Sequence, residues 1–219
     1  MKMLNTLPGI NQIDYGSSGF ILHSLILITA AVFAAVVLSG YTAKRFGGDK
    51  TKIRKCMVLV AFFISSLLVS FYGCTAYALK GTVLALILLF ASYQDMRTME
   101  CDDSIHLYII LAGLICADMK ALPLMILSGL LIGGAVLLAG IYTRSGIGGA
   151  DIKIVFACSF MTGIIGGLAG LLAGVVLALL DNLSKKKRKK KFPMIPYLAV
   201  GYMAVYLYQN LIADCKSKG

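Results

Sequence analysis

The chain has 219 residues, of which 59% are hydrophobic and 14% charged, and its mean hydropathy is +0.86. Soluble domains are about 45–50% apolar and about 25% charged, so this composition excludes an ordinary soluble protein and indicates an integral membrane protein. The net charge of +11 is also typical of proteins that bind nucleic acid. However, the longest basic run, residues 185–191, lies between two apolar stretches, where it is better explained as a topology signal. We expect no nucleic-acid partner.

Seven apolar stretches follow the polar residues 1–19. They cover residues 20–42, 56–73, 75–94, 104–118, 121–142, 152–183 and 194–212. A helix that crosses the ~30 Å hydrocarbon core needs about 20 residues. The sixth stretch is too long for one span, and Gly163, Gly166 and Gly167 predict a break inside it. The pattern predicts an all-α polytopic bundle of about eight transmembrane helices, one of them short, in a single membrane domain over residues 1–219.

Lysine and arginine collect in two segments, residues 44–55 and 185–191. Short cytoplasmic loops carry the excess of these residues, and such loops attract anionic lipid headgroups. We therefore expect both segments at the cytoplasmic face of the cell membrane, with both termini outside. Residues 1–19 lack a basic segment that leads into a short apolar run and a small-residue cleavage site. We expect no cleavable signal peptide, and the first apolar stretch is interpreted as a permanent anchor.

Two acidic residues are the main candidates for chemistry. Asp95 ends an apolar stretch, and Asp151 follows Gly146, Gly148 and Gly149 in a short loop. Ionisable groups at membrane depth are costly and usually functional. The predicted topology places both at the cytoplasmic face. Two carboxyl groups that share one proton can hydrolyse a peptide bond, because the neutral group polarises the carbonyl and the ionised group activates water.

Other interpretations of this pair stay open. Asp151 is equally explained as the N-cap of a helix that starts at Ile152. Paired intramembrane acids also line proton or cation paths. A small proton- or cation-coupled transporter is therefore the alternative function, which an internal inverted repeat would favour. No such repeat is evident in the sequence.

Three ordered motifs resemble a known family. They are the Asp-Met-Arg-Thr run that begins at Asp95, the Gly-Gly-Ala-Asp-Ile-Lys run that begins at Gly148, and the Pro-containing run over residues 192–201. Over about residues 57–212 the chain resembles the type IV prepilin peptidases, which are intramembrane aspartyl proteases with a G-x-G-D motif. The resemblance implies that Asp95 and Asp151 are the catalytic pair. It also implies that the substrate is the N-terminal leader of a prepilin or pseudopilin, cut at the cytoplasmic face and usually after a glycine. No cofactor is implied.

The chain departs from the family pattern at two places. Ala150 replaces the glycine that usually precedes the second aspartate, and Asp102 and Asp103 stand where the family commonly has an Ile-Pro-Asn or Ile-Pro-Asp step. The loss of proline removes a rigid turn. Asp102 and Asp103 compete for the role given to Asp95, or they cap a helix that begins at Ser104.

Several residues around the acids have two interpretations each. Gly148 and Gly149 allow a substrate strand to approach the acid closely. Lys153 matches a basic residue of the family motif and either serves the active site or extends towards the membrane surface. Arg97 is either active-site support or a topology anchor. The larger family members also methylate the new amino terminus and carry paired C-x-x-C motifs. Because this chain has none, we expect a peptidase without methyl transfer.

The remaining residues suggest structure rather than chemistry. Six cysteines form no C-x-x-C pair and are interpreted as buried, inert thiols, and His23 and His106 have no ligand spacing, so no metal site is expected. Gly166, Gly170 and Gly174 repeat at four-residue spacing, which allows two helices to pack closely. We expect this packing within the chain rather than in a dimer.

Overall fold

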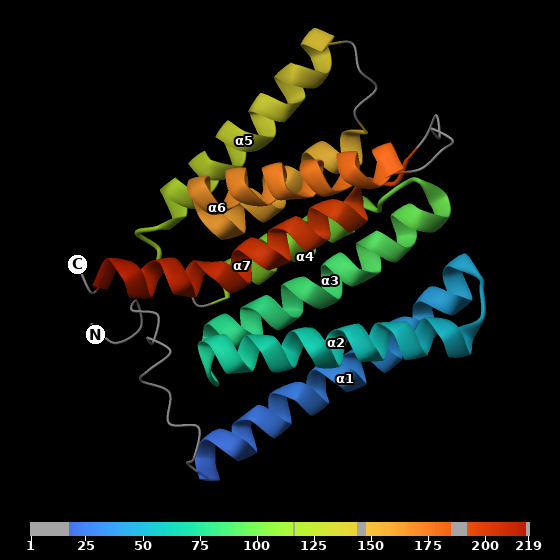
Figure 1. The fold of residues 1–219 in the computed structure, drawn as a ribbon, viewed down its shortest axis with the longest axis vertical. Helices are drawn as coiled ribbons and strands as arrows, with labels where there is room; N and C mark the ends of the chain where they lie inside the picture. The colour runs from blue at the N-terminus through green and yellow to red at the C-terminus, as the bar shows by residue number, and fades with distance from the viewer. Residues whose placement is uncertain (1–17, 116, 144–147, 185–191, 218–219) are drawn as a thin grey trace. The chain divides into compact units, whose positions relative to one another are not determined.

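The structure is a computed structural model that describes residues 18–115, 117–143, 148–184 and 192–217. These residues form α-helices and contain no strand (Figure 1). The helices are α1 Ser18–Phe46, α2 Lys50–Tyr72, α3 Ala76–Thr98, α4 Asp103–Leu114, α5 Leu122–Thr143, α6 Gly149–Ser184 and α7 Ile195–Ser217. The all-α prediction is confirmed.

Within the described part of the chain, five helices are long and apolar enough to cross a membrane: α1, α2, α3, α5 and α6. The chain is thus a multi-pass membrane protein, while the count of about eight spans is not confirmed. Three features discussed from the sequence lie outside the described residues: the segment 1–17, Gly146 and the basic run 185–191.

The first helices extend beyond the apolar stretches that predict them. α1 continues to Phe46, and the next residue, Gly47, has a φ of 71°, which a glycine adopts without strain at a helix end. α2 begins at Lys50, six residues before the predicted start, because Asp49 caps it: its Oδ1 accepts hydrogen bonds from the main-chain N–H of Thr51 (2.9 Å) and Lys52 (3.4 Å). Apolar runs mark the part of a helix in lipid, and polar capping fixes where it ends.

Contacts divide the chain into two compact units, residues 1–86 with 206–219 and residues 87–205. In the first unit α1 and α2 lie side by side (Figure 1). Tyr206 closes this unit, because its hydroxyl donates a hydrogen bond to the Tyr77 carbonyl (2.8 Å) and its own carbonyl accepts one from the buried Tyr72 hydroxyl. Buried hydroxyls stabilise a fold when they are paired in this way.

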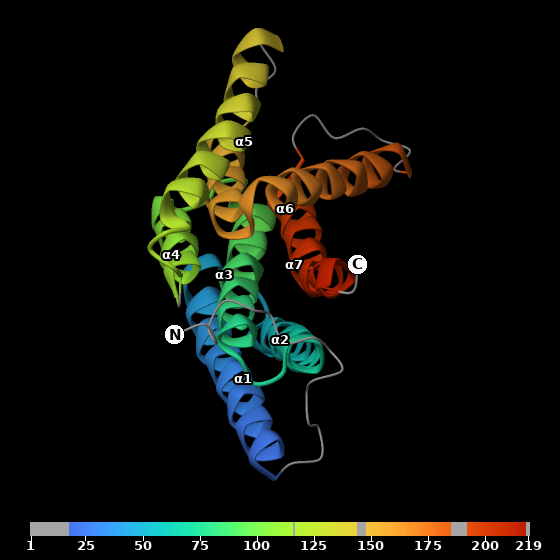
Figure 2. The same cartoon turned by 90° about the vertical axis from the view of Figure 1, so that its left-hand side faces the viewer.

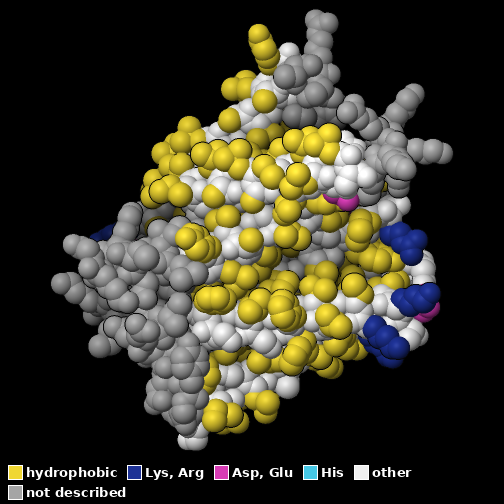
Figure 3. Space-filling view, in the orientation of Figure 1, with side chains coloured by type: hydrophobic (Ala, Val, Ile, Leu, Met, Phe, Trp, Pro, Cys, Tyr) yellow, Lys and Arg dark blue, Asp and Glu magenta, His cyan; other side chains and the backbone are white. Residues whose placement is uncertain are grey.

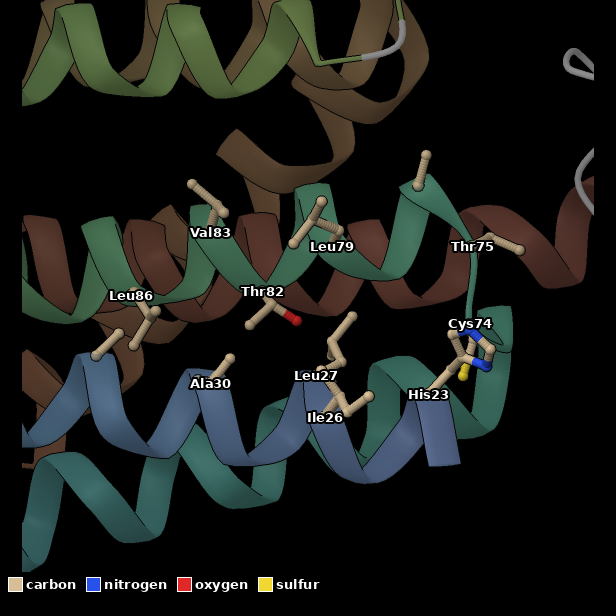
Figure 4. A pocket seen from close by; sticks show the side chains of 13 residues that line it. His23, Ile26, Leu27, Ala30, Cys74, Thr75, Leu79, Thr82, Val83 and Leu86 are labelled. Atoms are coloured by element: carbon tan, nitrogen blue, oxygen red, sulfur yellow. The ribbon is translucent and has the colours of Figure 1, made fainter. Parts of the chain in front are cut away.

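The first unit also contains an apolar cavity of about 510 Å³ between α1 and the beginning of α3 (Figure 4). Its lining includes Leu27, Leu79 and Leu86, with His23 and Cys74 at one end (Figure 4). No carboxylate lines this cavity. It therefore lacks the acid groups that the predicted chemistry requires.

In the second unit the long helix α6 is broken at Gly163, as the sequence predicts. Gly163 has φ 76° and ψ −178°, a conformation that other residues rarely adopt. Figure 2 shows the two parts of α6 running in different directions. A buried polar cluster lies just before the break. The Ser159 hydroxyl is 3.1 Å from the Tyr202 hydroxyl. The Ser159 carbonyl accepts a hydrogen bond from the Ser128 hydroxyl on α5 (2.8 Å).

Glycines allow α6 and α7 to meet at backbone distance. A Cβ atom at Gly201 would lie 2.5 Å from the Gly170 carbonyl oxygen and 2.6 Å from the Gly174 nitrogen, and a Cβ atom at Gly174 would lie 2.9 Å from the Leu198 Cα. No side chain fits at such distances, so the prediction that these glycines pack helices within the chain is confirmed. This contact fixes the position of α7 along α6.

Large apolar side chains are exposed along most helices, as expected of surfaces that face lipid (Figure 3). In the same view, lysine and arginine side chains gather at the right-hand edge (Figure 3). The prediction of buried cysteines is wrong for Cys56 and Cys74, which are exposed, and holds for Cys158. The error arises because Cys56 lies near the polar beginning of α2, directly after Lys55, and Cys74 lies in the turn between α2 and α3. Neither thiol is therefore inside the helix packing.

Candidate active site

Asp95 lies in the last turn of α3 and is only 6% exposed. Its Oδ2 accepts a hydrogen bond from the Ile195 N–H (3.0 Å), and the Met194 N–H is a second main-chain donor. Both donors belong to the start of α7, where main-chain N–H groups have no partner inside the helix. The beginning of α7 therefore orients the Asp95 carboxylate and supplies partial positive charge to it.

The helix α3 ends directly after this carboxylate. Met99 has a φ of 55°, and its N–H donates to the Asp95 carbonyl (2.9 Å). A left-handed residue at this position stops a helix and turns the chain. The helix extends four residues beyond the predicted end at residue 94, so Asp95 lies within α3 rather than after it.

Asp151 lies in the first turn of α6, which begins at Gly149. The interpretation of Asp151 as the N-cap of a helix from Ile152 is therefore wrong, because the helix begins three residues earlier and the Asp151 N–H already bonds the Gly148 carbonyl (3.0 Å). A Cβ atom at Gly148 would lie 3.0 Å from Asp151 Oδ2, whereas one at Gly149 would meet nothing within 4 Å. Gly148 thus leaves the carboxylate uncovered by a side chain.

The two acids and the loop after α3 form one electrostatic cluster in the second unit. The charge of Asp95 acts on Asp151. Cys101, in the loop between α3 and α4, is influenced by the same charges. Its thiol pKa is raised to about 12, first by burial and then by the charges of Asp95, Asp102, Asp151 and Asp103. The charges of all four carboxylates thus act on the same half-buried thiol.

Lys153 does not pair with the candidate catalytic acids. Its Nζ lies 2.5 Å from Asp103 Oδ1, and both side chains are exposed. Hydrogen bonding and the charge of Lys153 lower the pKa of Asp103. This ion pair joins the start of α4 to the start of α6, next to Asp151. Arg97 instead folds back along α3, where its Nε donates to the Tyr93 hydroxyl (3.1 Å) and its guanidinium lies 5.5 Å from that ring.

The two competing acids have distinct positions. Asp102 occupies the N-cap of α4, with φ −64° and ψ 138°, but its side chain makes no capping hydrogen bond. Asp103 is the first residue of α4, one residue before the predicted helix start at Ser104. Asp103 is exposed and paired with a cation. It therefore lacks the burial that raises the pKa of a carboxyl group and favours its protonated form.

Sequence reasoning missed three groups in the unit that contains the acids. One is the pair of main-chain donors at Met194 and Ile195. Pro196 could have indicated them from the sequence, because proline favours the first turn of a helix and so predicts a helix start at this position. The others are Gln94, which is 3% exposed, and His106, which is 7% exposed. Their buried polar atoms, Gln94 Oε1 and both His106 ring nitrogens, have no hydrogen-bond partner among the described residues.

The arrangement is suited to acid–base chemistry on a neutral substrate. Two partly or fully buried carboxyl groups interact, one of them is held by main-chain donors, and a glycine leaves the other accessible. Over the ranges that the structure describes, no group of three or more His, Cys, Asp or Glu side chains is placed to hold a metal ion.

Comparison with known proteins agrees with this site. No curated protein and no solved structure matches the chain. Residues 82–181 match a family described as the type IV leader peptidase family. The matched region contains Asp95, Asp151 and the residues that join them. Residues 82–181, which are less than half of the chain, are therefore similar to the type IV leader peptidase family.

Proposed function

We propose that the protein is an intramembrane aspartyl endopeptidase that removes the N-terminal leader of prepilin or pseudopilin substrates. The observation that carries the proposal is that the charge of Asp95, on α3, acts on Asp151, on α6. Both residues lie within the region of the family match. The family match and the three sequence motifs support a leader peptidase in general. The identity of the substrate follows from the resemblance alone.

In the proposed reaction Asp95 and Asp151 share one proton. The ionised carboxylate accepts a proton from water as the water oxygen bonds to the scissile carbonyl carbon, and the neutral carboxyl group donates its proton to the carbonyl oxygen. When the C–N bond breaks, one proton passes to the leaving nitrogen and one returns to the pair. The pair titrates as a unit, so no separate pKa is assigned to either residue.

The surroundings of the pair support this chemistry. The Ile195 N–H holds Asp95 in a fixed orientation, which lowers the entropic cost of reaching the reactive geometry. Gly148 carries no side chain over Asp151, so an extended substrate segment can cross the loop. We propose no metal, no cofactor and no methyl transfer, because the chain lacks the paired C-x-x-C motifs of the larger family members.

We further propose that cleavage occurs at the cytoplasmic face. This proposal is supported by the basic residues exposed at the turn between α1 and α2, since short cytoplasmic loops are rich in lysine and arginine and attract anionic headgroups. They are Lys44, Arg45, Lys50 and Lys52. If α2 and α3 each cross the membrane once, the end of α3 returns to the same face. The end of α3 carries Asp95.

Co-expression with a candidate prepilin tests the proposal. Immunoblots would compare leader removal by the wild type, Asp95→Asn and Asp151→Asn, with Asp103→Asn as the matched control. We expect Asp95→Asn and Asp151→Asn, the two dyad variants, to lose processing by at least about a thousandfold, since an amide cannot share the proton of the pair. Asp103→Asn should continue to process the substrate. Full processing by Asp95→Asn together with loss in Asp103→Asn would transfer the first catalytic role to Asp103. Processing by both dyad variants would refute the aspartyl mechanism.

A further inference from the structure

His106 is a buried polar residue that the proposed mechanism does not use. It lies on α4, is 7% exposed, and neither ring nitrogen has a hydrogen-bond partner among the described residues. Burial of a polar group without a partner is unfavourable, so buried imidazoles normally have one. An imidazole without a partner among the described residues, on which the charge of Lys153 acts, therefore suggests that its partner arrives with the substrate.

The position of His106 relative to α6 follows from two contacts. Asp103, at the start of α4, binds Lys153, and Gly113, ten residues later, lies against α6, where its Cβ would be 3.1 Å from the Phe160 ring. The two helices therefore run in the same direction along their contact. His106 is three residues after Asp103 and seven before Gly113, so it lies on the same face of α4.

This register directs the His106 ring towards the first two turns of α6, the segment that carries Asp151. The charges of Lys153 and Asp103 act on the ring, which agrees with that position. A second unpaired oxygen, that of Gln94, lies one residue before Asp95 in the sequence. Both residues whose buried polar atoms lack a partner among the described residues thus belong to the unit that contains the acids.

We propose that His106 is a substrate-positioning residue, whose ring hydrogen-bonds the main chain of the substrate next to the scissile bond. This inference rests on the proposed peptidase function. An extended peptide segment at membrane depth brings N–H and C=O groups that have lost their water partners and must be paired. A neutral imidazole offers one donor and one acceptor, and these match the two groups that such a segment presents. His106 takes no part in proton transfer.

The test compares His106→Leu with His106→Gln in the full-length protein in detergent, with His23→Leu as a control. His23 is an exposed histidine of α1 whose Nδ1 already lies 2.6 Å from the Gly19 carbonyl oxygen. For each variant, KM and kcat for a prepilin substrate are measured, and the thermal midpoint is measured without substrate. We expect His106→Leu to raise KM about tenfold with a smaller change in kcat, which indicates lost ground-state binding. His106→Gln, which keeps a donor and an acceptor, should restore KM to within about threefold.

The thermal midpoint separates this role from a structural one. If the ring is unpaired in the resting enzyme, His106→Leu should keep or raise the midpoint, because an unpaired buried polar group is removed. A midpoint several degrees lower, or an unchanged KM, would overturn the inference. If wild type cleaves, both dyad variants fail and His106→Leu keeps the wild-type KM, only this inference is wrong. If Asp151→Asn cleaves at the wild-type rate, the proposed function itself is wrong, and this inference falls with it.

Discussion

Gly201→Ala perturbs the point where α6 and α7 approach most closely. The added Cβ would lie 2.5 Å from the Gly170 carbonyl oxygen, 2.6 Å from the Gly174 nitrogen and 3.0 Å from its Cα. All three are backbone atoms, so no side-chain rotation relieves the overlap. Optimal contacts lie near 3.5 Å, and the two helices must separate by about 1 Å.

The expected free-energy change combines two opposing effects. Overpacking costs about 1–3 kcal/mol, and alanine in place of glycine favours a helix by about 1 kcal/mol. We expect Gly201→Ala to lower the free energy of unfolding by up to about 2 kcal/mol. Activity should fall roughly tenfold or more, because the shift displaces the Ile195 N–H from Asp95 and small misplacements are costly in catalysis.

Denaturant titration in mixed micelles measures the stability effect, and prepilin cleavage measures the activity. Gly134→Ala is the matched control, because Gly134 is also helical and a Cβ there meets nothing within 4 Å. This control should be as stable as wild type or more stable, by up to about 1 kcal/mol. A Gly201→Ala protein as stable as Gly134→Ala would refute the reasoning that backbone contact sets the position of α7.

Two further predictions concern the charged cluster. Because the pKa of its thiol is raised to about 12, Cys101 should react with iodoacetamide at pH 8 much more slowly than the exposed Cys56. Asp151→Asn should accelerate the reaction of Cys101. Mass spectrometry of both peptides measures the two rates, and equal rates in wild type would contradict the cluster. The pKa of Asp103 is lowered by Lys153, so its small contribution to stability is present above about pH 4 and is lost as pH falls through the folded-state value. The free energies of unfolding of wild type and Asp103→Asn should differ at pH 7 and converge as the pH falls below the folded-state pKa of Asp103. A difference that persists under acid conditions would exclude the ion pair as its source.

The sequence alone determined the features that depend on neighbouring residues. Apolar runs located every described helix, and Gly163 marked the break in α6, because helix length and backbone freedom are local properties. The motifs around Asp95 and Asp151 indicated the resemblance to leader peptidases before any geometry was available, and the family match over residues 82–181 agrees with it. Helix ends were less accurate, since α2 and α6 begin earlier than their apolar residues and α3 ends later.

Only the tertiary structure decided which partners these residues meet. Lys153 pairs with Asp103 rather than with Asp151, and the Ile195 N–H bonds Asp95 across 100 residues of chain. Neither contact has a local signal, because each depends on how the ends of separate helices come together. The same holds for His106, because its sequence neighbours do not reveal that its ring is buried without a partner among the described residues. Helix packing, set by glycine contacts such as that of Gly201 with Gly170, fixes these distances, and no pattern along one helix contains them.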